Sequence, residues 1–181
     1  NMKCLLFLFF SINLINYLDR GLIASFNQNF IEDFNITKTE SGFINSSFII
    51  GYILLSPLFS YLVYKYNKIV LIFIGLLIWS LSNLAASFSN SYYLFITSRI
   101  FVGAGEASFG TIGPAIIDTI SNYKNKSTNL AVYFLAIPLG YALGYIVGGI
   151  WTKKLPWHYT FLGESILMFI LSLFLFIYHK R

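Results

Sequence analysis

The chain contains six apolar stretches, and each is long enough to cross a lipid bilayer as a helix. About 20 apolar residues span the hydrocarbon core of a membrane, so six such stretches use nearly all of the 181 residues. The runs show no alternation of polar and apolar residues, which excludes the strands of a membrane barrel. We therefore predict an all-α membrane protein with six transmembrane helices, over residues 4–26, 41–64, 69–88, 92–120, 129–151 and 159–178.

The composition excludes a soluble globular protein. Only 10% of the residues are charged, whereas soluble domains carry roughly 25%. The net charge of +5 comes from basic residues that are scattered through short loops rather than gathered in a stripe. This pattern does not indicate a nucleic-acid partner.

The basic residues instead predict the orientation, because Lys and Arg are retained on the cytoplasmic side of a membrane. With both termini cytoplasmic, the loop Asn27–Glu40 is luminal or external. The cytoplasmic ends then hold Lys3, Lys65, Lys68, Lys124, Lys126, Lys180 and Arg181, and the opposite side holds Lys38, Lys153 and Lys154. The sequence leaves open whether this multi-pass protein lies in an organelle or in the plasma membrane.

The six stretches are not equivalent, and they pair by character. The first and fourth carry charges at midspan, the second and fifth are rich in small residues and contain proline, and the third and sixth are nearly uniformly apolar. This order predicts two inverted three-helix repeats.

Four charged residues lie well inside the predicted spans: Asp19, Arg20, Arg99 and Glu106. A charge at the bilayer centre costs at least about 2.5–3.5 kcal/mol, so such residues are candidates for function. Asp19 and Arg20 project about 100° apart, and we expect one to line a cavity and the other to pair with a neighbouring helix. Arg99 and Glu106 share one face about 10 Å apart, as two stations on one aqueous path.

A carboxylate gives up its proton beside a cation and regains it when the cation moves away, so these groups are candidates for proton coupling. The alternative is a static polar network that holds the helices together. Asp118 and Glu164 lie near predicted helix ends, where side chains reach the headgroups, and we expect no functional role for them.

Several glycines predict close contact between helices. Gly103 and Gly105 lie in a run of small residues, and Gly140, Gly144 and Gly148 form a stripe with a spacing of four. We find no nucleophile-and-base arrangement and no metal or cofactor motif, so the sequence does not predict an enzyme.

Three segments carry a resemblance to a known family: Asn16-Tyr17-Leu18-Asp19-Arg20, Arg99-x-x-x-Gly103-x-Gly105-Glu106-Ala107-Ser108, and Ala136-Ile137-Pro138-Leu139-Gly140. They resemble the spinster-type transporters of the major facilitator superfamily. Members have twelve helices in two halves, so the chain looks like the N-terminal half, with the second half absent. The resemblance implies export of lysophospholipids or sphingolipids, and it implies coupling and substrate binding at Asp19, Arg20, Arg99 and Glu106.

The sequence departs from the superfamily at the loop that latches the cytoplasmic gate. Tyr64 replaces the usual acid and Ser60 the usual glycine, while Lys65 and Lys68 keep the positive charge. A latch that uses a carboxylate at this position cannot form. The sequence therefore does not predict how the gate is held closed.

The leading hypothesis is a proton-coupled transporter of an amphipathic lysolipid or sphingolipid. Two alternatives are a major facilitator transporter of sugars or organic anions, and a non-transporting membrane scaffold or degenerate half-transporter. The expected partners are membrane lipids, an amphipathic small molecule, protons, and the missing C-terminal half or a second copy of the chain.

Overall fold

The computed structural model describes residues 2–151 and 155–180 and is built almost entirely of helices. The described residues form no strand. The six long helices overlap the six predicted ranges, and all are long and apolar enough to cross a membrane. The prediction of an all-α fold with six membrane helices is therefore confirmed. The long helices are α1 (Met2–Ser25), α3 (Lys38–Leu62), α4 (Lys68–Ser87), α5 (Tyr92–Ile120), α6 (Lys126–Trp151) and α7 (His158–Lys180).

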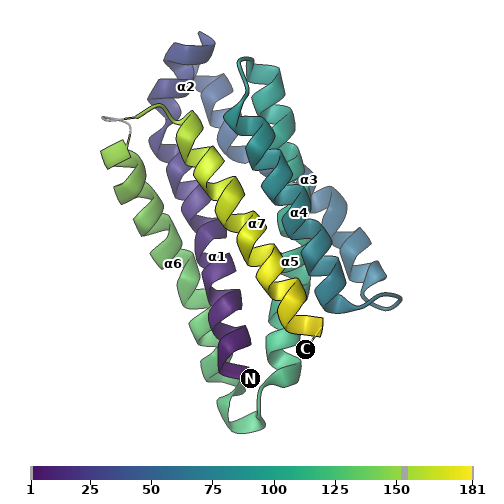
Figure 1. The fold of residues 1–181 in the computed structure, drawn as a ribbon. Helices are drawn as coiled ribbons and strands as arrows, with labels where there is room; N and C mark the ends of the chain where they lie inside the picture. The colour runs from purple at the N-terminus through teal and green to yellow at the C-terminus, as the bar shows by residue number, and fades with distance from the viewer. Residues whose placement is uncertain (1, 152–154, 181) are drawn as a thin grey trace.

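The helices run side by side as a bundle, with the two chain ends at the same end of it (Figure 1). Helix α1 packs chiefly on α6, while α5 packs on α3 and α4, and α4 also packs on α7. The bundle thus consists of a two-helix unit (α1 and α6) and a four-helix unit (α3, α4, α5 and α7). Three of the basic residues used for orientation, Lys153, Lys154 and Arg181, lie outside the described residues, as does the side chain of Lys180.

The packing agrees in part with the expected repeats. If α1 is exchanged with α5 and α6 with α3, the contact between α1 and α6 becomes the contact between α5 and α3, and both are extensive. The two midspan-charged helices, α1 and α5, are therefore equivalent in this contact, but α5 packs extensively on α4 whereas α1 contacts α7 only slightly.

Glycines make these close helix contacts possible. A methyl group on Gly103 of α5 would lie 1.8 Å from the carbonyl oxygen of Phe48 in α3, and one on Gly105 would lie 2.5 Å from that of Gly75 in α4. The face of α5 between Arg99 and Glu106 is thus filled by a neighbouring helix. Along the other contact, the α6 glycines meet α1 between Leu14 and Ser25; these glycines are Gly140, Gly144 and Gly148.

The segment 27–40, expected to be a loop, contains the short helix α2 (Asn27–Phe34). Its Phe30 is fully buried against the rings of Phe26, which follows α1, Phe95 of α5 and Trp157, which precedes α7. Trp157 also donates a hydrogen bond to Asp33 at 2.6 Å. This packing explains why so short a helix forms. Asn35 ends α2 in the left-handed region, at φ 51°, and Thr37 begins α3 with a capping box.

A short 3₁₀ turn, η1 (Tyr123–Asn125), joins α5 to α6 at the end of the bundle that holds the termini. Helix α2 lies at the opposite end (Figure 1). The aromatic cluster around Trp157 packs at that opposite end.

Candidate functional site

The four predicted charged residues form two ion pairs that link α1 to α5. Arg99 donates through Nη1 to Oδ1 of Asp19 at 3.1 Å and through Nη2 to the second carboxylate oxygen. Arg20 donates through Nη2 to Oε2 of Glu106 at 2.8 Å. The side chains of Asp19, Arg99 and Glu106 are fully buried, whereas that of Arg20 is 18% exposed. Each helix thus contributes one arginine and one carboxylate.

The Asp19–Arg99 pair extends into α4 and α7. Arg99 also donates through Nη1 to Oδ1 of Asn83 at 3.1 Å, and Asn83 in turn donates through Nδ2 to Oε2 of Glu164 at 3.3 Å. We call these four residues, Asp19, Asn83, Arg99 and Glu164, the buried polar network. The side-chain amide of Asn83 accepts a hydrogen bond with its oxygen and donates one with its nitrogen, which fixes its orientation between a cation and a carboxyl group.

The interpretation of Glu164 as a side chain that reaches the headgroups is wrong. Only 6% of the residue is exposed, and its carboxyl group points into the bundle. Its neighbour Ser165 exchanges reciprocal hydrogen bonds with Ser80 of α4, at 2.9 and 2.8 Å, and these hold α7 against α4. Glu164 lies near the start of α7, but α7 is rotated so that the helix face that carries Glu164 points into the bundle.

Asp118, for which we also expect no functional role, is exposed, unlike Glu164. It pairs with Lys126 at 2.6 Å, and both side chains are more than 40% exposed, at 42% for Lys126 and 44% for Asp118. This pair joins the end of α5 to the start of α6 and lies away from the polar network.

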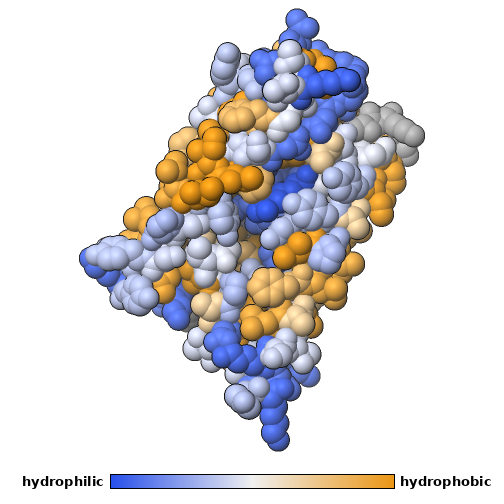
Figure 2. Space-filling model, turned by 180° about the vertical axis from the view of Figure 1, so that it is seen from behind, coloured by the Kyte–Doolittle hydropathy of each residue, from blue (hydrophilic) through white to orange (hydrophobic). Residues whose placement is uncertain are grey.

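A polar cavity of about 170 Å³ lies beside the Arg20–Glu106 pair. Of the four predicted charged residues, Arg20 is the one that lines it. Figure 2 shows hydrophilic atoms deep in a hollow of the face opposite to that of Figure 1. The cavity is bounded by α1, α3, α5 and α6, through Asn13, Asn16, Tyr17, Arg20, Tyr52, Gly110, Pro114, Tyr133, Phe134 and Ile137.

Aromatic rings hold the guanidinium of Arg20 at the cavity wall. Its central carbon lies 4.7 Å from the ring centroid of Tyr17 and 4.3 Å from that of Phe48. The side-chain oxygen of Asn16 and Oε1 of Glu106 are buried without a hydrogen-bond partner among the described residues. Asn16 lines the cavity beside Arg20, so the site combines a positioned cation with a neighbouring polar side chain.

The sequence analysis did not single out Asn83 or Tyr52, although both carried a signal. Asn83 is an amide in the last third of the predicted span 69–88, and a polar group inside a span needs a partner in the bundle. Tyr52 follows Gly51 in α3, and its hydroxyl reaches Gly110 of α5 so closely that a methyl group there would lie 2.4 Å from it.

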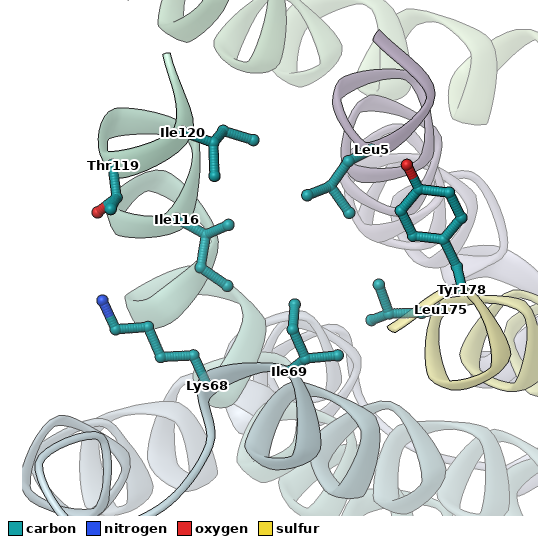
Figure 3. A pocket seen from close by; sticks show the side chains of 8 residues that line it. All are labelled: Leu5, Lys68, Ile69, Ile116, Thr119, Ile120, Leu175 and Tyr178. Carbon is teal, nitrogen blue, oxygen red and sulfur yellow. The ribbon is translucent and has the colours of Figure 1, made fainter. Parts of the chain in front are cut away.

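The predicted gate lysines lie at the end of the bundle that holds the termini. The ammonium group of Lys65 lies 4.7 Å from the ring centroid of Tyr61. Lys68 borders a second cavity, of about 400 Å³, where its side chain extends along the end of α5 (Figure 3). Apolar side chains from α1, α4, α5 and α7 line most of this cavity, which lacks the convergent polar groups of the Arg20 site. Among the described residues, no cluster of His, Cys, Asp and Glu could hold a metal ion.

Comparison with known proteins agrees with this architecture. Residues 9–181 match the Major Facilitator Superfamily. The chain therefore belongs to the major facilitator superfamily and is an integral, multi-pass membrane protein.

Relatives of the chain include spinster proteins. The chain is 39% identical over 183 residues to the probable sphingolipid transporter spinster homolog 2 of Arabidopsis thaliana, with 92% of this chain and 38% of that protein covered. It is 40% identical over 154 residues to protein spinster homolog 1 of Xenopus laevis, with 83% and 29% covered. The chain thus spans well under half the length of these curated relatives.

A solved structure shows the same fold. It is the inward-facing, unoccupied form of a bacterial homolog to the human lysosomal transporter Spinster. The TM-score is 0.83 at 19% identity, and the match covers 97% of this chain and 42% of that chain. The sequence predicts one half of a major facilitator fold, and the structure has the same fold as less than half of this transporter.

Proposed function

We propose that the chain forms the N-terminal half of a secondary active transporter that moves a lysophospholipid or sphingolipid and couples this movement to protons. The observation that carries the proposal is the position of Arg20. It is a cation held by a buried carboxylate at the wall of a polar cavity, within a bundle whose outer faces are apolar. The sphingolipid part of the proposal is supported by the similarity to a probable sphingolipid transporter of Arabidopsis thaliana.

The cavity offers separate places for the two parts of an amphipathic molecule. A phosphate headgroup would bind the guanidinium of Arg20, because such charge-assisted hydrogen bonds are strong and specific. Arg99 is unsuited to this role, since Asp19 and Asn83 occupy it and it is fully buried. The acyl chain would lie along the exposed apolar side chains of α3 and α6, such as Leu54 and Leu135.

Proton coupling follows from competition for Arg20. A phosphate that binds Arg20 draws it away from Glu106, which is then a buried carboxylate without its cation. Leaving such a charge uncompensated is costly, so Glu106 takes up a proton. Asp19 is the second proposed coupling group, since a proton on its carboxylate would weaken its ion pair with Arg99 without any contact between Arg99 and the substrate. Binding of substrate and of a proton thus become linked through one shared arginine.

The exposed faces of α3 and α6 are also where a second half, or a second copy, would pack and complete the cavity. In the membrane we place both termini on the cytoplasmic side, as the distribution of lysines favours. The cavity then opens toward the cytoplasm, and the aromatic cluster around α2 closes the other side.

Uptake of a fluorescent lysophospholipid into vesicles that contain the full-length protein tests this function. We expect uptake to depend on a pH gradient and to fall about 10- to 100-fold in Arg20→Gln, which corresponds to the loss of one charged hydrogen bond. The matched control is Lys124→Gln, which removes an exposed charge and leaves uptake unchanged. Equal uptake by the two variants would refute the role of Arg20.

Glu106→Gln separates binding from coupling. This variant mimics the protonated state, so we expect it to bind lysolipid but to lose its response to the pH gradient. Wild-type gradient dependence in this variant would contradict the coupling scheme. A thermal-shift screen distinguishes the alternatives, since a sugar or organic-anion carrier is stabilised by those compounds, and a scaffold by none of them.

A further inference from the structure

The mechanism above leaves one buried ionisable group without a task, namely Glu164 of α7. The residue is 6% exposed, and its Oε2 accepts a hydrogen bond from Asn83 at 3.3 Å. Its other oxygen, Oε1, is buried without a hydrogen-bond partner among the described residues. Among the described residues, the one side chain that donates to Glu164 is thus the neutral amide of Asn83, whereas Asp19 and Glu106 are each paired with an arginine.

The charges of the bundle interior do not balance if every group is ionised. The described helices place two arginines, Arg20 and Arg99, among three carboxyl groups, Asp19, Glu106 and Glu164. Asp19 has both oxygens bound by Arg99, and Glu106 is bound by Arg20, so these two are the ionised partners. Glu164 is the carboxyl group left without a cation of its own.

The surroundings of Glu164 favour its neutral form. The charged groups that act on it are Asp19 of α1, which lies within hydrogen-bonding reach of its carboxyl group, and Arg99 and Glu106 of α5. These are two carboxylates and one cation. Helix α4 contributes the neutral Asn83 and Ser80 beside it. An unpaired buried carboxylate is so costly that such a group binds a proton instead.

We propose that Glu164 is a second proton-binding group of the protein, which holds a proton while Asp19 is paired with Arg99 and releases it when that pair opens. Asn83 makes the connection, because it contacts Arg99 with one end of its amide and Glu164 with the other. When Asp19 leaves Arg99 or becomes neutral, the arginine needs another anion, and Asn83 links it to Glu164. The role of Glu164 in transport rests on the proposed proton-coupled function, but its protonation does not.

Infrared spectroscopy of the purified full-length protein in lipid nanodiscs tests the protonation directly. At neutral pH we expect a carbonyl stretch from a protonated, buried carboxyl group, and we expect Glu164→Gln to abolish it. The control is Glu32→Gln, which removes an exposed carboxylate from α2 and leaves the band unchanged. Persistence of the full band in Glu164→Gln would overturn the proposal.

Two further variants test the link to the Asp19–Arg99 pair, and the expected effects have opposite signs. Asp19→Asn leaves two arginines with two carboxyl groups, so Glu164 ionises and the band disappears. Arg99→Gln leaves one arginine with three carboxyl groups, so the band roughly doubles. An unchanged band in both variants would refute the link, whereas a structural role alone predicts no such change.

The same samples distinguish this proposal from the proposed function. If the band behaves as expected but vesicle uptake ignores the pH gradient, Glu164 binds a proton and the coupling scheme fails. If uptake is gradient-dependent and the band is absent, Glu164 is ionised and this inference fails.

Discussion

The contact between α3 and α5 depends on the absence of a side chain at Gly51. A methyl group there would lie 1.8 Å from the carbonyl oxygen of Ile100 and 2.9 Å from the amide nitrogen of Ala104. Both atoms belong to the backbone of α5, so no side-chain rotation can relieve the overlap. The reciprocal glycine, Gly103, meets the backbone of Phe48 in α3 just as closely.

The size of the effect of Gly51→Ala follows from these distances. Carbon and oxygen atoms approach to about 3.3 Å at the closest favourable contacts, so α3 and α5 must separate by roughly 1.5 Å. Overpacking of a buried contact costs typically about 1–3 kcal/mol, and a displaced backbone places this variant near 3 kcal/mol. Phe48 would move with α3 and away from the guanidinium of Arg20, so lysolipid binding would weaken as well.

The assay is unfolding in mixed micelles with increasing amounts of SDS, followed by circular dichroism. Gly42→Ala is the matched control, because it lies in the same helix and a methyl group there has no atom of the described residues within 4 Å. We expect the control to be neutral or up to about 1 kcal/mol more stable, as alanine favours a helix. Equal stability of Gly51→Ala and Gly42→Ala would refute the packing argument.

Three further predictions concern the network, the α2 end and the orientation. Arg99→Leu leaves Asp19 as an uncompensated buried charge and lowers the free energy of unfolding by about 3–5 kcal/mol. Adding Asp19→Leu removes that charge and restores most of the loss, and additive losses in the double variant would contradict this. Trp157→Phe removes the hydrogen bond to Asp33 and lowers the free energy of unfolding by about 1.5–3 kcal/mol. We also expect faster hydrogen exchange in α2, and an unchanged exchange rate would contradict the role of this hydrogen bond. After Cys4→Ser, an impermeant maleimide labels Lys124→Cys only from the cytoplasm, and labelling from outside would reverse the orientation.

The sequence was sufficient to predict the helices and the charged positions. Apolar length alone defines a membrane span, and a charge inside such a span must find a partner or a cavity. The partners themselves were not predictable, because spacing along one helix fixes only where side chains point around that helix. Arg99 and Glu106 share a face of α5, but the structure alone shows that they meet different residues of α1.

Glu164 and α2 show where sequence reasoning failed. On α7, Phe161, Ser165, Met168 and Ser172 are all buried and follow a helical spacing, and this pattern marks the face beside Glu164 as internal. In the predicted loop, a segment of this length without structure is unusual, and two phenylalanines four residues apart indicate one helix face. Both signals were weaker than the apolar runs that surround them.

The arrangement of the ion pairs indicates which end of the bundle can open. Asp19 and Arg20 are adjacent on α1, but their partners on α5 lie two turns apart, and only the long arginine side chains bridge the difference. The Asp19–Arg99 pair lies nearer the α2 end, which the aromatic cluster closes. When substrate or a proton releases Arg20 from Glu106, α1 therefore stays attached to α5 at that end. We expect the unit of α1 and α6 to pivot about this remaining pair, so that the cavity widens toward the chain termini while the opposite end stays shut.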